Sequence, residues 1–421
     1  MKILVAATAC RPYAGSEAYV GWQAINALRH DHELWVMTSL WCRPAIERLI
    51  NSEGGWTRVR FVYVDEQEGD RPYSDNRMIA RLQSWMRYRK WCRYASVAAK
   101  RLNQQIKFDL AHHVTYATWR MGSPLAGIGI PWIWGPIGGG EVFPLRMIPV
   151  LSPVAAIFEL VRAINTWLAK KSPTVRRAAR EATLVLPNNP ETERLVSGLG
   201  VPRNRTRRLC QSFLTEERLG SLKRTQWMTP KECGEVRLVA GGNLEGRKGV
   251  AIALRAIAQL AVEGIPIQYT YLGRGPELAH LKALADRLGI ADRVNFVDSL
   301  SGDEYVQALQ SSHVYLLPSL REGVPVTQME AMAAGCVPIV ADCGGAGPMA
   351  RSSGAEPIPV STMDRMTGEI AEAIKSCWEN PERWIELSHR SSEGIRSGYC
   401  SEHYLAMMRE CYAAVASNRL G

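Results

Sequence analysis

Two glutamates with seven residues between them lie where an apolar strand gives way to a helix. Glu322 lies in the turn Arg321–Pro325, which follows the apolar segment 314–318. Glu330 lies in the Ala- and Met-rich stretch after that turn. A glycine turn leading into a helix N-terminus offers free backbone N–H groups to an anion, and carboxylates accept hydrogen bonds from hydroxyls. This pattern suits a ligand that carries both phosphates and sugar hydroxyls, as a sugar nucleotide does.

The segment 319–342 as a whole resembles the retaining glycosyltransferases of family 4, which have the GT-B fold. The resemblance implies that Glu322 lies beside the donor sugar and that Glu330 binds the ribose of the nucleotide. It also implies that Gly323 and Val324 border the donor. The alternative is that both carboxylates are solvated surface groups.

A second constellation follows the predicted strand 237–240, where a glycine-rich turn leads to a basic pair and then to a helix. Arg247 and Lys248 precede that helix, so a diphosphate would gain from both cations and from the helix dipole. The turn resembles the family 4 phosphate loop, in which Lys248 matches the family's lysine. After Gly242 the family usually has an arginine, and Asn243 takes its place here. We expect Arg247 to compensate for that charge; an ordinary basic loop is the alternative.

Two further segments border the donor site by the same resemblance. Gly273 lies in the glycine-rich stretch 271–277, directly after a predicted strand. Val297 ends the strand 294–297, where the family's backbone contacts the nucleobase.

Two segments of the first half, 11–22 and 134–141, resemble a Gly-Ser-Glu subgroup of the family, and a third, 108–116, resembles the family as a whole. Gly15 opens a turn that is expected to approach the donor, and Glu17 either faces the acceptor or balances the helix dipole. In the family a histidine at the end of the strand 108–112 bonds the donor sugar, and both His112 and His113 qualify. Successive strand residues point to opposite faces, so one of the two is expected to be structural, and we favour His113 as the ligand. The glycine run within 134–141 is expected either to bring backbone amides to a ligand or to be a flexible loop.

These residues require two parallel α/β sheets to position them, because short apolar strands alternate with longer helical stretches along the chain. We predict two doubly wound, Rossmann-like domains that face each other across a cleft, as in GT-B. Twelve strands are expected, at 3–7, 34–38, 59–64, 108–112, 131–134, 183–186, 237–240, 268–272, 294–297, 314–317, 337–340 and 357–359.

The predicted domains are an N-terminal domain over 1–209 and a C-terminal nucleotide-sugar-binding domain over 236–399, joined by a polar linker over 210–235. A chain of 421 residues is too long for one ordinary core. By resemblance, the helical end of the chain, 400–421, is expected to pack back on the first domain.

Charge is concentrated in the first half of the chain. Residues 1–208 hold 30 Lys and Arg against 16 Asp and Glu, although the whole chain has a net charge of only +10. In the segment 77–94 the basic residues alternate with Trp, Tyr and Met, which suits the anionic face of a membrane. The alternative is a surface helix whose aromatic residues pack on the core. No nucleic-acid recognition motif accompanies the charge, so a nucleic-acid partner is not expected.

The sequence favours the cytoplasm, at the inner face of the cytoplasmic membrane. The ten cysteines form no CxxC pair, which is typical of a reducing compartment. Residues 1–10 suit a first buried strand better than a signal peptide. The longest uncharged run, 121–140, is half Gly and Pro and cannot form a membrane-spanning helix.

The sequence therefore predicts a retaining hexosyltransferase that uses a UDP- or GDP-sugar. Its acceptor is expected to be a lipid-linked saccharide, as in bacterial exopolysaccharide or lipopolysaccharide biosynthesis. A sugar-nucleotide epimerase on the same fold, or a sugar-nucleotide-binding protein without activity, are the alternatives. Retention of Glu322, Glu330 and Lys248 together favours the enzyme.

The acidic residues show no metal-binding cluster, so the sequence predicts transfer without a metal or other cofactor. We expect turnover to be unchanged by excess chelator, because Lys248 and Arg247 supply the positive charge that a metal would otherwise provide. A chelator-inactivated enzyme that Mn²⁺ restores would contradict this.

Overall fold

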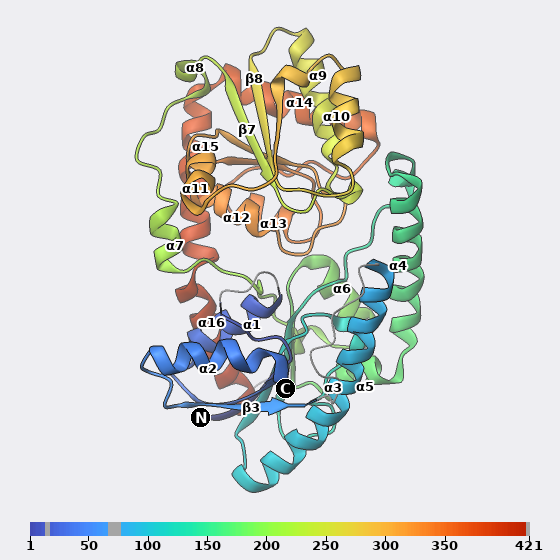
Figure 1. Ribbon diagram of the computed structural model, residues 1–421, viewed down its shortest axis with the longest axis vertical. Helices are drawn as coiled ribbons and strands as arrows, with labels where there is room; N and C mark the ends of the chain where they lie inside the picture. Colours follow the sequence, from blue (N-terminus) through green and yellow to red (C-terminus); the bar gives the residue numbers. More distant parts are fainter. Residues whose placement is uncertain (13–16, 66–76, 418–421) are drawn as a thin grey trace. The chain divides into compact units, whose positions relative to one another are not determined.

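The computed structural model describes residues 1–12, 17–65 and 77–417. These residues form two compact units. Unit 1 comprises residues 1–140, 165–211 and 404–421, and unit 2 comprises residues 141–164 and 212–403. Each unit is built around one parallel sheet, as predicted, and Figure 1 shows helices packed against both sheets.

The sheet of unit 1 has the strand order β3-β2-β1-β4-β5-β6, and its strands pair in parallel. In a parallel sheet that helices cover on both faces, the strands have continuous apolar sequences. In agreement, β1, β4, β5 and β6 are almost wholly buried. The strands are β1 (Lys2–Ala7), β2 (Glu33–Ser39), β3 (Val59–Val64), β4 (Leu110–Thr115), β5 (Trp132–Ile137) and β6 (Leu184–Pro187).

The helices of unit 1 cover this sheet with aromatic side chains. Trp91 and Tyr88 of α3 are buried in its core, whereas Trp85, Met86 and Tyr94 on the same helix are 39–49% exposed. The basic, aromatic segment therefore packs partly on the core and partly faces water. The helices are α1 (Glu17–Leu28), α2 (Arg43–Ser52), α3 (Arg77–Ile106), α5 (Pro173–Glu181), α6 (Pro190–Gly198) and most of α16 (Ser401–Ala416); α4 (Pro153–Lys171) begins in unit 2 and ends in unit 1.

The sheet of unit 2 has the order β11-β10-β7-β8-β9. The predicted strand at 357–359 is wrong as a strand, because Ile358 makes only an isolated bridge to Ala341. Five of the six expected strands are present: β7 (Val236–Gly241), β8 (Ile267–Leu272), β9 (Val294–Val297), β10 (Val314–Leu317) and β11 (Val337–Val340).

Helices surround the sheet of unit 2, and in Figure 1 its strands lie between α9 and α10 on one side and α11 and α15 on the other. The stretch 212–235, within the predicted linker, belongs to unit 2 and contains α7 and α8. The helices are α7 (Glu216–Ser221), α8 (Pro230–Cys233), α9 (Val250–Val262), α10 (Leu278–Arg287), α11 (Gly302–Gln310), α12 (Val326–Ala333), α13 (Ala346–Arg351), α14 (Met363–Glu379) and α15 (Pro381–Gly398).

The strand order places the predicted loops. In unit 2 the chain leaves β7 toward β8 and β9 and returns on the other side of β7 as β10. Ligands of open α/β sheets bind beyond the carboxyl ends of the strands at such a switch point. The loop after β7 carries Lys248 and the turn after β10 carries Glu322, so neighbouring strands bring these side chains together.

The C-terminal helix is joined to the sheet of unit 1 by a buried hydrogen bond. The Nδ1 of His112 lies 2.8 Å from the hydroxyl of Tyr412, and both residues are fully buried. We expect Tyr412→Phe to destabilise the protein by about 1–3 kcal/mol, because the buried imidazole loses its partner. The measurement is the melting temperature from calorimetry, which should fall by roughly 2–4 °C per kcal/mol.

Tyr94→Phe is the matched control, since Tyr94 is 39% exposed in the same unit. Its melting temperature should stay near that of the wild type. Equal melting temperatures for the two variants would show that the His112–Tyr412 contact contributes nothing.

Candidate functional site

A buried cluster of opposite charges lies at the carboxyl end of the sheet in unit 2. The Nζ of Lys248 donates to Oε2 of Glu322 at 2.5 Å, and the hydroxyl of Ser319 donates to the same oxygen at 3.2 Å. The Nη1 of Arg247 lies 3.7 Å from that oxygen. Glu322 and Lys248 are each only 7% exposed. The structure thus brings together Glu322, Lys248 and Arg247.

The electrostatics of the cluster keep Glu322 ionised. Burial alone raises the pKa of its carboxyl, but attraction by Lys248 and then by Arg247 outweighs burial, and the pKa is lowered from its ordinary value. The pKa of Arg247 is raised, because its attraction to Glu322 and Glu245 exceeds the effect of burial. The cluster holds two cations against the carboxylates of Glu322 and Glu245, so both cations are fixed in position at the sheet edge.

Close backbone packing fixes this geometry. Gly249 follows Lys248 with φ 68°, and a Cβ there would lie 2.1 Å from the carbonyl oxygen of Pro318. Gly344 has φ 56°, and its Cβ would overlap the carbonyl oxygen of Glu322. Only glycine fits at both positions, because each combines a left-handed backbone with a close approach. The small residues of 342–347 therefore serve the packing of the Glu322 turn.

Backbone amides also face this edge of the sheet. The N-cap residues of helices α9, α12 and α13 are Gly249, Pro325 and Gly345, which provide no side-chain cap, whereas α7, α8, α11 and α14 each have one. The first N–H groups of a helix have no partner within the helix, and they attract anions. An anion at the sheet edge would find these amides beside the two cations.

Glu330 lies on α12 and has a different set of partners. The Nε of Arg218 donates to its Oε1 at 2.8 Å, and the hydroxyl of Tyr305 donates to its Oε2 at 2.7 Å. No local sequence pattern marks either partner: Arg218 lies in the stretch 210–235 that is predicted to be a linker, and no motif accompanies Tyr305 on α11. A carboxylate has about four lone-pair sites, so Glu330 can still accept hydroxyl groups of a ligand.

The glycines predicted to border the donor lie at neighbouring strand ends. The amide of Gly242 donates to Leu272 at the end of β8, and the amide of Gly273 donates to Val297 at the end of β9. Gly242, Gly273 and Val297 therefore form a row at the carboxyl edge of three strands. Asn243 donates from Nδ2 to Glu245 at 2.7 Å, so it shares that carboxylate with Arg247.

The rest of the predicted turn is held from the other side. The carbonyl of Gly323 accepts the amide of Gly345 at 2.9 Å, and Val324 is half-buried. Both residues lie between Glu322 and the start of α12, at the edge that Lys248 also reaches.

The two histidines of unit 1 are buried and differ in their partners. Besides the contact with Tyr412, Nε2 of His112 lies 2.6 Å from the carbonyl oxygen of Gly135, so both its ring nitrogens are engaged. The Nε2 of His113 lies 3.3 Å from the hydroxyl of Tyr88. Burial lowers the pKa of His112 to about 4 and that of His113 to about 3, so both are neutral near pH 7. The engagement of His112 favours a structural role for it.

The Gly-Ser-Glu motif is partly outside the described residues, which do not include Gly15. Glu17 is the first residue of α1 and accepts the amide of Ala117 at 2.5 Å. Burial raises the pKa of its carboxyl although this hydrogen bond lowers it. The carboxylate of Glu17 therefore ties α1 to the loop after β4.

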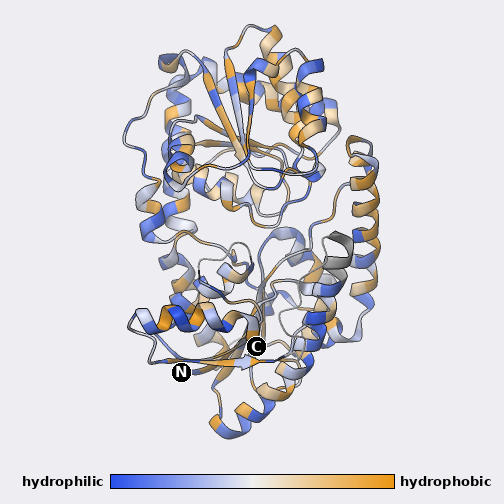
Figure 2. Ribbon diagram, in the orientation of Figure 1, coloured by the Kyte–Doolittle hydropathy of each residue, from blue (hydrophilic) through white to orange (hydrophobic). Residues whose placement is uncertain are grey.

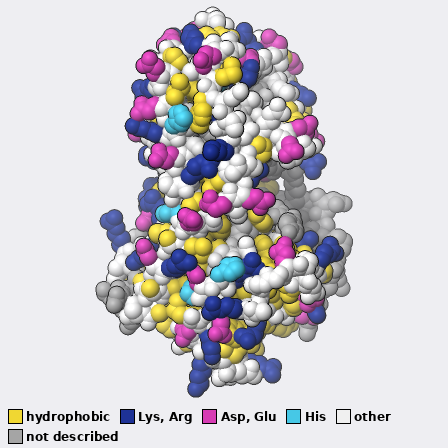
Figure 3. Space-filling view, turned by 90° about the vertical axis from the view of Figure 1, so that its left-hand side faces the viewer, with side chains coloured by type: hydrophobic (Ala, Val, Ile, Leu, Met, Phe, Trp, Pro, Cys, Tyr) yellow, Lys and Arg dark blue, Asp and Glu magenta, His cyan; other side chains and the backbone are white. Residues whose placement is uncertain are grey.

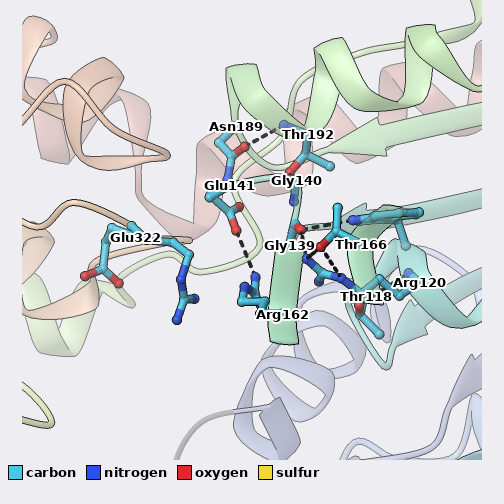
Figure 4. A network of polar contacts seen from close by, with 12 residues as sticks. Thr118, Arg120, Gly139, Gly140, Glu141, Arg162, Thr166, Asn189, Thr192 and Glu322 are labelled. Atoms are coloured by element: carbon cyan, nitrogen blue, oxygen red, sulfur yellow. Dashed lines mark hydrogen bonds and ion pairs between the residues drawn. The ribbon is translucent and has the colours of Figure 1, made fainter. Parts of the chain in front are cut away.

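The glycine run after β5 is supported by Arg120 in unit 1. Arg120 donates to the carbonyl of Gly139 and to the hydroxyl of Thr166, and the indole N–H of Trp119 donates to Gly139 at 3.0 Å. Figure 4 shows Arg120 and Thr166 converging on Gly139. This network argues against a freely flexible loop.

Two further ion pairs in unit 2 involve the segment 141–164, which the sequence predicts as part of the N-terminal domain. Glu159 on α4 receives Arg321 in a bidentate pair at 2.9 and 2.7 Å. Arg162 on α4 points at Glu141, 3.9 Å away (Figure 4). Arg321 directly precedes Glu322, and its carbonyl accepts Nη1 of Arg247 at 2.9 Å. Glu159 thus steadies the turn that carries Glu322.

The described residues form neither a candidate metal site nor a helix able to span a membrane. Nowhere in 1–12, 17–65 or 77–417 do three His, Cys, Asp or Glu side chains group so that they could hold a metal ion. None of the helices in these ranges has both the length and the apolar content that crossing a bilayer requires.

Comparison with known proteins agrees with this geometry. Residues 227–390 match the family model described as glycosyl transferases group 1. The chain is 26% identical over 259 residues to WcaL of Salmonella typhimurium, which is assigned to colanic acid biosynthesis as a glycosyltransferase. It is 36% identical over 112 residues to the amylovoran biosynthesis glycosyltransferase AmsK of Erwinia amylovora. These alignments cover 59% and 25% of this chain. The chain spans only 56% and 27% of the two relatives' own lengths.

Similar solved structures extend over nearly the whole chain. Anabaena HepE in complex with UDP superposes with a TM-score of 0.62 at 16% identity, covering 98% of this chain and 100% of that one. The apo lipopolysaccharide outer core galactosyltransferase WaaB superposes with a TM-score of 0.61 at 14% identity and complete coverage of both chains.

The two parallel sheets and these superpositions define a protein of the GT-B fold. Within it, residues 227–390 are similar to the group 1 glycosyl transferases, whose family model they match.

The Glu159–Arg321 pair yields a stability prediction. We expect Glu159→Gln to cost about 3 kcal/mol, because it leaves the Arg321 guanidinium, whose side chain is only 15% exposed, without its counter-charge. The melting temperature of unit 2 should fall by roughly 6–12 °C.

Glu386→Gln provides the control in the same unit, since Glu386 pairs with Arg390 and both side chains are 55% exposed. Exposed pairs contribute little, so its melting temperature should barely change. A combined Glu159→Gln/Arg321→Gln variant should lose less than the sum of its single changes. Strict additivity would show that the pair is not coupled.

Proposed function

We propose that this protein is a retaining glycosyltransferase that moves a hexose from a UDP- or GDP-sugar to a saccharide acceptor. The observation that carries the proposal is the cluster of Glu322 with Lys248 and Arg247 at the switch point of the second sheet. The family match over 227–390 supports the reaction class.

Charge compensation is the main work of this site. Negative charge builds on the diphosphate as it leaves, and Lys248, Arg247 and the uncapped helix N-termini are placed to receive it. Because the cations are already paired with carboxylates, they are oriented before the donor binds. Preorganised charge of this kind acts without reorganisation during the reaction.

The carboxylates grip the two sugars of the donor in this proposal. Glu322 accepts hydroxyls of the hexose, and Glu330 accepts those of the ribose. Gly242, Asn243, Gly273, Gly323 and Val324 line the donor, Val297 contacts the base through its backbone, and His113 bonds the hexose. The contact of Gly15 with the donor, predicted for the N-terminal domain over 1–209, falls outside the described residues.

The transfer step needs no protein base. The acceptor hydroxyl attacks the anomeric carbon on the face from which the diphosphate departs. A bond forms between the acceptor oxygen and that carbon, and the bond to the diphosphate oxygen breaks. A diphosphate oxygen takes the proton of the attacking hydroxyl, so the configuration is retained.

A lipid-linked saccharide is the acceptor we propose, in bacterial exopolysaccharide or lipopolysaccharide biosynthesis at the cytoplasmic face of the membrane. The relatives named for colanic acid and amylovoran biosynthesis support this polysaccharide context. The exposed Trp85, Met86 and Tyr94 of the basic helix α3 are consistent with contact to an anionic bilayer.

The donor site is tested by binding and turnover together. UDP, GDP and their sugars are screened by thermal shift, in which the true donor nucleotide raises the melting temperature by mass action. Lys248→Ala and Glu330→Ala should each reduce turnover at least about a hundredfold, as expected for a lost charged contact in the transition state. Lys375→Ala, which removes an exposed lysine paired with Glu263 in the same unit, should leave turnover unchanged.

Near-normal turnover in both site variants would refute the assignment of these residues. Conversion of a UDP-sugar without any acceptor would instead identify an epimerase. Nucleotide binding with no transfer to any saccharide acceptor would favour a binding protein.

A further inference from the structure

Helix α4 (Pro153–Lys171) has its polarity reversed. From Val154 to Ile164 the exposed side chains are apolar: Val154 is 75% exposed, Ile157 62%, Val161 59% and Ile164 59%. These positions follow the i, i+3, i+7 spacing of a single helix face. Leu160 flanks them at 44% exposure, and Trp167 and Leu168 continue the same face at 56% and 54%. We call these seven residues the α4 stripe.

The two charged residues within this part of α4 point the other way. Glu159 is only 8% exposed and holds Arg321, and Arg162 pairs with Glu141. These ion pairs fix the rotation of the helix about its axis, so the α4 stripe cannot turn inward without breaking both. The outward position of the apolar residues is therefore set by specific contacts within unit 2.

No other described surface resembles this stripe in length, because the remaining exposed large apolar residues lie singly or in small groups. Figure 2 shows α4 with apolar colouring along most of its length. On the face drawn in Figure 3, by contrast, basic, acidic and apolar side chains are interspersed. An apolar surface as large as the α4 stripe marks a contact with a partner or a membrane.

Cations follow the stripe directly. Lys170 and Lys171 are exposed in the last turn of α4, and Nζ of Lys171 lies 3.6 Å from the centre of the Trp167 ring. The next helix, α5, exposes Arg176, Arg177 and Arg180. Only Glu181 offers an exposed acidic group between 153 and 181. A tryptophan with apolar neighbours, followed by a block of cations, is the arrangement of helices that lie in the interface of an anionic bilayer.

We propose that the α4 stripe is the surface by which this protein inserts into an anionic lipid bilayer, with Lys170 and Lys171 at the level of the headgroups. This inference does not require glycosyl transfer, and it goes beyond the contact proposed for α3. A bilayer suits the stripe better than a second copy of the chain, because no acidic group accompanies the stripe to meet the cations of a partner. Through Glu159, the same helix contacts the residue next to Glu322.

The test is co-sedimentation with vesicles of phosphatidylcholine, with and without phosphatidylglycerol. The wild type should bind the mixed vesicles and not pure phosphatidylcholine, and binding should weaken as salt is raised. Val161→Gln should reduce the partition coefficient about fivefold, and the triple change Ile157→Gln/Val161→Gln/Ile164→Gln should abolish binding. Lys170→Ala should reduce binding about fivefold, in line with the attraction of one cation to an anionic surface.

Val262→Gln is the matched control, because Val262 also lies on a helix and is 91% exposed. It should sediment like the wild type. Glutamine is a good helix former, and the altered positions are exposed, so every variant should keep the wild-type melting temperature and the wild-type response to UDP. That response separates this proposal from the proposed function, since lipid binding and nucleotide binding are read independently.

Equal sedimentation of the wild type and the triple variant would overturn the proposal, as would failure of the wild type to bind the mixed vesicles. Sedimentation velocity without lipid measures whether the protein is a monomer or a dimer, which tests a second copy of the chain as the partner of the stripe. A monomeric wild type supports the bilayer as the partner. A dimer that the triple variant dissociates would assign the stripe to a second copy of the chain and overturn the lipid assignment.

Discussion

Lys248 and Glu322 are oppositely charged, withdrawn from water and in direct contact, and the candidate site depends on that contact. Removing two charges from water is costly, and the cost is recovered only when each charge finds the other with good geometry. The strand order provides this geometry, because β7 and β10 are neighbours and their loops emerge side by side. Because Gly249 and Gly344 have no side chain, their backbone can lie directly against the carbonyl groups of Pro318 and Glu322. The cations are thereby held in place at the edge where an anion would bind.

The turn that carries Glu322 is supported from both sides. Arg247 reaches the carbonyl of Arg321, and the side chain of Arg321 is held by Glu159. Helix α4 therefore has two functions in one element: its inner face completes the charge network of unit 2, and its outer face presents apolar side chains. The charged residues Glu159 and Arg162 pair with residues of unit 2 instead of facing water. The opposite, apolar face of α4 is therefore exposed to solvent. Helix α4 thus carries both the exposed apolar face and Glu159, which pairs with Arg321 directly before Glu322.

Much of the fold could be predicted from the sequence, and the failures have physical causes. The short apolar runs predicted the strands well, because buried parallel strands have few polar residues. The run at 357–359 failed as a strand because two of its three residues are prolines, which cannot donate ladder hydrogen bonds, so Ile358 forms one isolated bridge. Arg218 could not be predicted as a partner of Glu330, because it lies in a polar stretch that resembles a linker. The two residues are 112 positions apart in the sequence, and no local pattern indicates their contact. Likewise, adjacent histidines look equivalent until Tyr412, distant in sequence, engages one of them.

The sequence by itself determined the class of fold, the parallel sheets and the residue types at the site, because apolar periodicity and glycine turns are local properties of the chain. Only the tertiary structure decided which of those residues meet. It paired Lys248 with Glu322 and gave Glu330 its own partners, Arg218 and Tyr305. It also turned the apolar face of α4 outward. The physical reason is that such contacts join residues far apart in the chain, so they depend on strand order and long-range ion pairs that no local pattern encodes.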